Sequence, residues 1–141
     1  MTLITRNTDY AIRALIELAG NKGEFLSARQ IAKRQRVPYQ FLRRILRALI
    51  KNKLIASKGG RSGGFRIGKN PDSITVVDVM EIFQGDIQLS DCMFRNKPCV
   101  NRSNCVLRKR IVKIDKLVKR EFEDISIGRL LKDLKKQKGR S

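Results

Sequence analysis

The chain has 141 residues, of which 41% are hydrophobic and 6% aromatic. This length suits one small domain with an added helix and excludes two large independent cores. With 32 Lys and Arg against 13 Asp and Glu, the net charge is +19. No apolar run approaches the ~20 residues of a membrane-spanning helix, and no signal-peptide core is visible at the N-terminus, so we expect a cytoplasmic protein.

The positive charge is concentrated in the first half of the chain. Residues 1–70 contain 16 basic and three acidic residues, a net charge of +13. Such a field attracts polyanions and gains from the release of their counterions, so nucleic acid is the expected partner. An acidic membrane surface is a weaker alternative, because the basic residues alternate with turn signals instead of lying opposite an apolar helix face.

Three helices are expected at the start of the chain. The first runs from a cap at Asn7 or Thr8 to Gly20, with apolar residues at helical spacing between them. Ser27 caps a short second helix that ends before Pro38. The third helix is expected over 39–52. Its predicted buried side consists of Phe41, Leu42, Ile45, Leu46, Leu49 and Ile50.

A Gly-rich tip between two short β-prone segments follows, over residues 56–67, and predicts a β-hairpin wing. Residues 1–75 are therefore expected to form a winged helix-turn-helix. A helix over 76–83, ended by Gly85, leads into a connecting region with a cysteine-containing loop, residues 76–104. The predicted fold class is mainly α with a small β wing, plus a long C-terminal dimerisation helix.

The third helix has the features of a helix that reads the major groove of DNA. Gln40 and Arg43 are the best candidates for base contacts, because Gln can pair with adenine and Arg with guanine. Any exposed helix in so basic a chain carries Arg, so a single Arg is weak evidence for DNA binding. The whole set of residues is much stronger evidence. The predicted DNA-binding residues are Ser27, Tyr39, Gln40, Arg43, Arg44, Arg47, Lys51, Lys58 and Arg61.

Within this set, Arg44, Arg47 and Lys51 are expected to contact phosphates, and Lys58 and Arg61 supply the charge of the wing. The wing glycines allow a close approach to a sugar-phosphate backbone. The same glycines lack the ending and the strand-to-helix context of a P-loop, so nucleotide binding is not expected.

Three cysteines, Cys92, Cys99 and Cys105, form the pattern Cys-x6-Cys-x5-Cys before the last long helix. Thiolates gathered on one loop suit a soft metal or an iron-sulfur cluster, and a loop of this length is more than a single Zn site, with its tighter spacing, needs. Three reduced cysteines without a ligand are the plain alternative. The chain has no His, so a fourth ligand must be found elsewhere. Asp9 is a candidate if a second subunit presents it; its plain reading is an acid in the first turn of a helix.

A long helix is expected from about 105 to 125. Its apolar stripe consists of Leu107, Ile111, Ile114, Val118 and Ile125. The seventh-residue repeat is typical of a helix that pairs with another helix, so we expect a homodimer, with folding back on its own chain as the alternative. Residues 105–141 then comprise a dimerisation helix and a basic tail, and the tail from residue 132 is expected to be frayed.

Several segments together resemble the Rrf family of bacterial transcriptional regulators, and its iron-sulfur branch of IscR-, NsrR- and RirA-like proteins. These segments are residues 8–11, 27–32, 57–65 and 71–75, together with the three late cysteines. The resemblance implies a homodimer that binds a palindromic operator in double-stranded DNA and senses iron, nitric oxide or redox state through a 2Fe-2S or 4Fe-4S cluster. It further implies that Cys92, Cys99 and Cys105 are cluster ligands, with Asp9 offered by the opposite subunit.

The chain departs from the family pattern at three positions. Leu107 stands where IscR-like members have a His, the first cysteine gap is six residues instead of five, and Gly59 replaces a common Arg before the wing. The cluster type and the operator sequence therefore stay open. The alternatives are a thiol- or Zn-containing winged-helix regulator without a cluster, or a basic RNA-binding protein. An enzyme is the weakest reading, because no nucleophile-base pair is recognisable.

Overall fold

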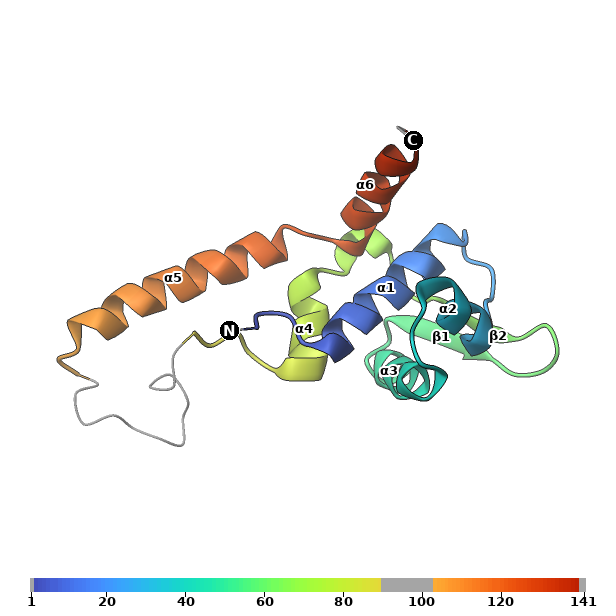
Figure 1. Cartoon of the computed structure of the whole chain (residues 1–141), viewed down its shortest axis with the longest axis horizontal. Coiled ribbons are helices and arrows are strands. Elements are labelled where there is room, and N and C mark those ends of the chain that lie inside the picture. The colour runs from blue at the N-terminus through green and yellow to red at the C-terminus, as the bar shows by residue number, and fades with distance from the viewer. Residues whose placement is uncertain (1, 90–102, 140–141) are drawn as a thin grey trace.

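A computed structural model describes residues 2–89 and 103–139 of the chain. In this part the protein is mainly helical with one small sheet, as predicted (Figure 1). The elements are α1 (Arg6–Gly20), α2 (Ala28–Gln35), α3 (Tyr39–Lys51), β1 (Ile55–Lys58), β2 (Gly64–Ile67), the 3-10 helix η1 (Pro71–Ser73), α4 (Val76–Gln84), α5 (Val106–Glu123) and α6 (Ile127–Gly139). No helix in these two ranges is both long and apolar enough to cross a bilayer.

Helix α1 begins earlier than the sequence predicted. Its cap is Thr5, whose hydroxyl accepts a hydrogen bond from the Thr8 backbone N–H at 3.4 Å. The expected cap, Thr8, is instead a fully buried residue of the first turn. Its hydroxyl donates to Gln84 Oε1 of α4 at 2.7 Å. A buried hydroxyl needs a partner, and α4 supplies one that sequence spacing alone does not reveal.

Helices α2 and α3 form the predicted helix-turn-helix. Ser27 caps α2 in a capping box with Gln30, and Arg36 ends α2 in the left-handed conformation. One face of α3 is buried in the core by Leu42, Ile45, Leu46 and Leu49. Phe41 was expected on this face, but 43% of it is exposed. The four buried residues already fill the apolar stripe at helical spacing, which leaves Phe41 at its edge.

The wing is an antiparallel hairpin in which Ile55 pairs with Ile67 and Lys58 with Gly64. Its second strand also exchanges two backbone hydrogen bonds with the segment before α2. These bonds join Leu26 and Phe65 at 2.8 Å and 2.7 Å. The wing is therefore fixed to the start of the helix-turn-helix and not only to the end of α3.

Helix α5 is the most exposed element, and it extends away from the rest of the molecule (Figure 1). Within the described residues it has no buried side chain, and α4 is its main contact in its own chain. The predicted stripe is exposed at Leu107 (63%) and Ile114 (50%). The helix ends at Glu123, before Ile125, and residues 125–127 pair instead with residues 74–76, where the Ile125 carbonyl accepts a hydrogen bond from Val76 N–H at 2.9 Å.

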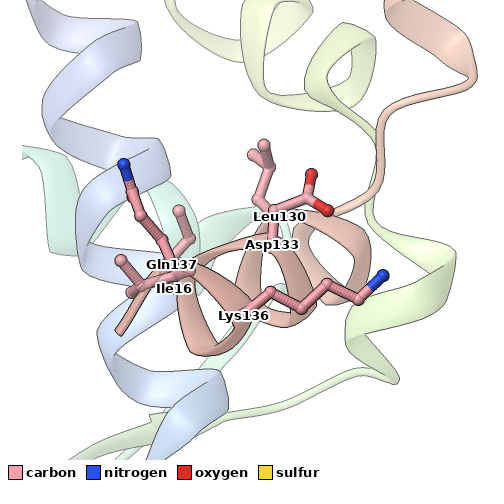
Figure 2. A pocket seen from close by; sticks show the side chains of 6 residues that line it. Ile16, Leu130, Asp133, Lys136 and Gln137 are labelled. Carbon is pink, nitrogen blue, oxygen red and sulfur yellow. The ribbon is translucent and has the colours of Figure 1, made fainter. Parts of the chain in front are cut away.

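The prediction of a frayed tail was wrong for residues 132–139, which belong to helix α6. The helix begins with Ile127, which is fully buried and whose N–H donates to Ile74 O at 2.8 Å. It then lies against α1, where a groove of about 590 Å³ is lined by Ile16, Leu130 and Leu134. Figure 2 shows the charged ends of Asp133 and Lys136 pointing away from Ile16. Helix α6 is thus an amphipathic helix that covers α1. It was missed in the sequence because Lys residues alternate with its Leu residues.

Candidate nucleic-acid interface

The predicted DNA-binding side of α3 is exposed along its whole length. Gln40, Arg43, Arg44, Arg47 and Lys51 are all exposed, opposite the three buried leucines and Ile45. They lie at three- and four-residue steps, so they share one side of the helix. The structure thus presents a polar and basic helix face of the kind that enters a major groove.

The start of α3 is set by a tight turn after α2. Arg36 adopts φ 54° and its N–H donates to Ala32 O, while the buried Val37 fastens the turn to the core. Pro38 then precedes Tyr39, the first residue of α3. Proline fixes its own φ and needs no N–H partner, so it suits a helix start. This turn places α3 against α2 and next to strand β1 of the wing (Figure 1).

Tyr39 contacts two arginines from different helices. The Arg29 guanidinium lies 4.7 Å from the centre of its ring, and the Arg43 guanidinium lies 5.8 Å from it. Both distances are within the range of a cation-π interaction. Arg29, in α2, is a member of this surface that the sequence reasoning missed.

The wing has a similar arrangement around Phe25. Lys58 Nζ lies 5.7 Å and the Arg66 guanidinium 5.1 Å from the centre of this ring. On α3, the Arg44 guanidinium lies 5.9 Å from the ring centre of the half-exposed Phe41. Arg61 lies exposed near the wing tip and makes no such cation-π contact within the described residues. The sequence reasoning also missed Phe25, which follows a turn and has no helical or strand periodicity to mark it.

The ion-paired carboxylates lie away from α3 and the wing. The ion pairs formed within the described residues are Arg13–Asp9 at 3.0 Å, Arg34–Glu17 at 3.1 Å and Lys119–Glu81 at 3.8 Å. In this part of the chain, none of them involves α3 or the wing. The basic side chains of the interface therefore keep their charge available for phosphates.

Ser27, also predicted to contact DNA, has its hydroxyl oxygen engaged in the cap of α2. It accepts from Gln30 N–H at 3.1 Å, and the Ser27 N–H donates to Gln30 Oε1 at 2.9 Å. The hydroxyl hydrogen is not used by these two bonds. The residue lies at the N-terminal end of α2, whose aligned peptide dipoles favour a nearby anion.

Of the predicted cluster ligands, Cys92 and Cys99 lie outside the described residues. Cys105 is the N-cap of α5, half-buried, and its Sγ accepts a hydrogen bond from Arg108 N–H at 3.3 Å. Asp9 is half-exposed and pairs with Arg13, one turn along α1. Over residues 2–89 and 103–139, no three acidic or cysteine side chains gather as a metal site would require.

A family of transcriptional regulators matches this chain over almost all of its length. The Rrf2 family, described as an iron-dependent transcriptional regulator, matches residues 4–133. The chain belongs to the Rrf2 family. As an Rrf2 protein it is a DNA-binding transcriptional regulator with a helix-turn-helix, in a family of regulators and not of enzymes.

Individual relatives of this Rrf2 protein agree with that assignment. The regulator NsrR of Shouchella clausii is 32% identical over 107 residues, covering 74% of this chain and 72% of the relative. The fold is similar to that of CymR, the global cysteine regulator of B. subtilis, with a TM-score of 0.77, 24% identity and coverage of 94% and 98%. It is also similar to that of T. potens IscR, with a TM-score of 0.73, 23% identity and coverage of 93% and 87%.

Proposed function

We propose that this Rrf2 protein is a homodimer that binds a palindromic operator and adjusts its binding through an iron-sulfur cluster. The observation that carries the proposal is the exposed basic side of α3, held next to a basic wing on a rigid core. Gln40 and Arg43 would read base edges, while Arg44, Arg47 and Lys51 would contact phosphates. Lys58 and Arg61 would contact the backbone beside the groove, and Ser27 would do so at the start of α2. DNA in a bacterial cell lies in the cytoplasm, where we expect the protein to act.

A second copy is the partner that best explains helix α5. The helix has 18 residues, and Val106, Leu107, Ile114 and Leu117 are each at least half-exposed. Leu107 and Ile114 are seven residues apart, and apolar side chains at this spacing gain most from burial against a like helix. Two such copies would present two α3 helices to the two halves of a palindrome.

The cluster is proposed to be held by Cys92, Cys99 and Cys105, as 2Fe-2S or 4Fe-4S. The described surroundings of Cys105 fit a thiolate ligand. Its sulfur accepts a backbone N–H at the N-terminus of a long helix, where negative charge is stabilised. Asp9, from the second copy, is the candidate for the fourth ligand. When bound, such a cluster would supply redox-active iron that can also bind nitric oxide, and its assembly would depend on iron supply, so each of these signals could change its state.

Anaerobic purification tests the cluster. We expect brown protein with visible absorption and equal amounts of iron and acid-labile sulfide, and we expect Cys99→Ala to lose both. Asp9→Ala should keep its fold and bind the cluster less stably if the carboxylate is a ligand. Colourless protein with one Zn per chain, or metal-free protein with three reactive thiols, would replace the cluster with Zn or thiol sensing.

Selection of duplexes from random-sequence DNA tests the DNA assignment separately. We expect an inverted repeat to be enriched, and binding to it to survive an excess of structured RNA. Equal competition by RNA would favour the RNA-binding alternative. Binding to all duplexes alike would contradict a palindromic operator.

A further inference from the structure

The ring of Tyr39 gathers two arginines at the junction of α2 and α3. Tyr39 and Arg43 are one helical turn apart in α3, so their contact at 5.8 Å is a local one. The contact with Arg29, at 4.7 Å, joins two helices across the turn. Tyr39 is half-buried, whereas both arginines are exposed, so the ring is the anchored partner in each contact.

An aromatic ring holds an arginine without neutralising it. The guanidinium stays fully charged, and the N–H donors along the edge of its plane stay available. Arg34, in the same helix as Arg29, shows the opposite case: it is ion-paired with Glu17 of α1 at 3.1 Å, so its charge is compensated. The two arginines of α2 therefore serve different purposes, and only Arg29 is held ready for an external anion.

Given the proposed role of α3 as the recognition helix, we infer that Tyr39 is a positioning residue for two DNA contacts. It holds Arg43 for its base contact and holds Arg29 for a phosphate beside the major groove. Arg29 is thus an additional DNA-binding residue, and it extends the interface from α3 onto α2.

The arrangement also favours the bound state energetically. Two cations held near one ring repel each other in the free protein, and the negative charge of bound DNA relieves this repulsion. The ring limits the rotamers of both long side chains before binding, so less conformational entropy is lost in the complex. Both effects require the face of the ring and neither requires the tyrosine hydroxyl.

Binding measurements on a duplex selected by the wild-type protein test the inference. We expect Arg29→Gln to weaken binding about tenfold and to reduce the slope of log affinity against log salt by about 0.9, the value for one phosphate contact. The control Arg34→Gln removes the same charge from the same helix on its ion-paired side and should change affinity less than about twofold. An equal effect of both substitutions would show only the loss of net charge and would overturn the inference.

Substitutions of Tyr39 separate the ring from the hydroxyl. Tyr39→Phe should bind as the wild type does, whereas Tyr39→Leu should weaken binding about tenfold and lower discrimination at the base pair that Arg43 reads. A loss in Tyr39→Phe as large as in Tyr39→Leu would assign the effect to the hydroxyl and contradict a positioning ring.

The contact can also be tested without DNA. The chain has two Tyr, so labelling with 3-fluorotyrosine gives two fluorine resonances, and Tyr10→Phe assigns them. We expect Arg29→Gln to shift the Tyr39 resonance and to leave that of Tyr10 in place, while Arg34→Gln shifts neither. An unmoved Tyr39 resonance would overturn the inference, even if DNA binding stands. A wild-type protein that selects no duplex would instead contradict the proposed function.

Discussion

At the scale of single residues, Gln84 connects the end of α4 to the start of the chain. Its side-chain oxygen accepts from Thr8 Oγ1 at 2.7 Å and from Thr5 N–H at 3.1 Å, and its nitrogen donates to Leu3 O at 2.8 Å. Gln84 is the last residue of α4, and Asp9 follows Thr8 directly. The cap of α1 and the point where the chain leaves for Cys92 are thus held together by one amide.

We predict that Thr8→Val lowers the free energy of unfolding by about 1–2 kcal/mol, because it keeps the buried shape and removes the hydroxyl that Gln84 Oε1 accepts from. Urea denaturation measures the loss. Thr2→Val, at an exposed position, removes the same atom and should change stability by less than about 0.5 kcal/mol. Equal stability of the two variants would show that the buried hydrogen bond contributes nothing.

The interface residues that could be predicted are those marked by a pattern within one segment of the sequence. The exposed side of α3 follows from helical spacing, and the structure exposes every side chain expected there except the half-buried Tyr39. The Arg29–Tyr39 contact spans ten positions and a turn, and no periodicity marks it. Thr8 and Phe41 were misplaced for a related reason: the partner that buries Thr8 is in α4, and the core beneath α3 is already filled by four other side chains.

At the scale of elements, the wing depends on one close backbone approach. Gly64 has φ +145°, and a Cβ there would overlap the Leu26 carbonyl, with which β2 pairs through Phe65. Both the backbone angle and the contact therefore require glycine. The conformation of Gly64 sets the distance between the wing and the start of α2.

We predict that Gly64→Ala destabilises the protein by about 2 kcal/mol and weakens DNA binding, since the methyl group separates β2 from Leu26 and displaces the wing. Thermal unfolding and titration with the selected duplex measure the two effects. Gly59→Ala is the matched control, because a Cβ at residue 59 meets no atom within 4 Å. If both variants unfolded at the same temperature, the close approach at Gly64 would not constrain the fold.

The β hairpin and the helix starts at Ser27 and Pro38 were predictable, because caps and turns have strong local signals. The structure of the C-terminal region was harder to predict. Helix α6 is stabilised by pairing of residues 125–127 with residues 74–76 and by packing on α1, which are both long-range contacts. Its basic composition alone resembles a solvated tail.

At the scale of the whole molecule, helix α5 extends away from the compact DNA-binding part and carries an exposed apolar face (Figure 1). Its attachment to its own chain includes the exposed Lys119–Glu81 ion pair at 3.8 Å, a weak contact. The distance between two recognition helices in a dimer would therefore depend on how two α5 helices pair. A change at Cys105, the cap of α5, would act at the N-terminal end of that same helix.

We predict that Ile114→Lys converts the proposed homodimer to a monomer, because it would place a charge in the centre of the stripe along which two α5 helices pair. Sedimentation velocity measures the oligomeric state, and operator affinity should fall by at least about 100-fold, since one half-site is lost. Glu123→Lys, at the exposed end of α5, should remain dimeric. A dimeric Ile114→Lys protein, or a wild type that is already monomeric, would remove α5 as the dimer contact.

The aromatic supports of the basic side chains affect how the protein behaves in a cell extract. Four basic side chains contact aromatic rings instead of carboxylates, so their charge can bind the phosphates of any nucleic acid. They are Arg29, Arg43, Lys58 and Arg66. We therefore expect cellular RNA to remain attached at low ionic strength. The chain contains no Trp and two Tyr, so its own ultraviolet absorption is weak and traces of RNA will dominate it. Heparin chromatography in high salt should therefore precede every determination of protein concentration and of metal per subunit.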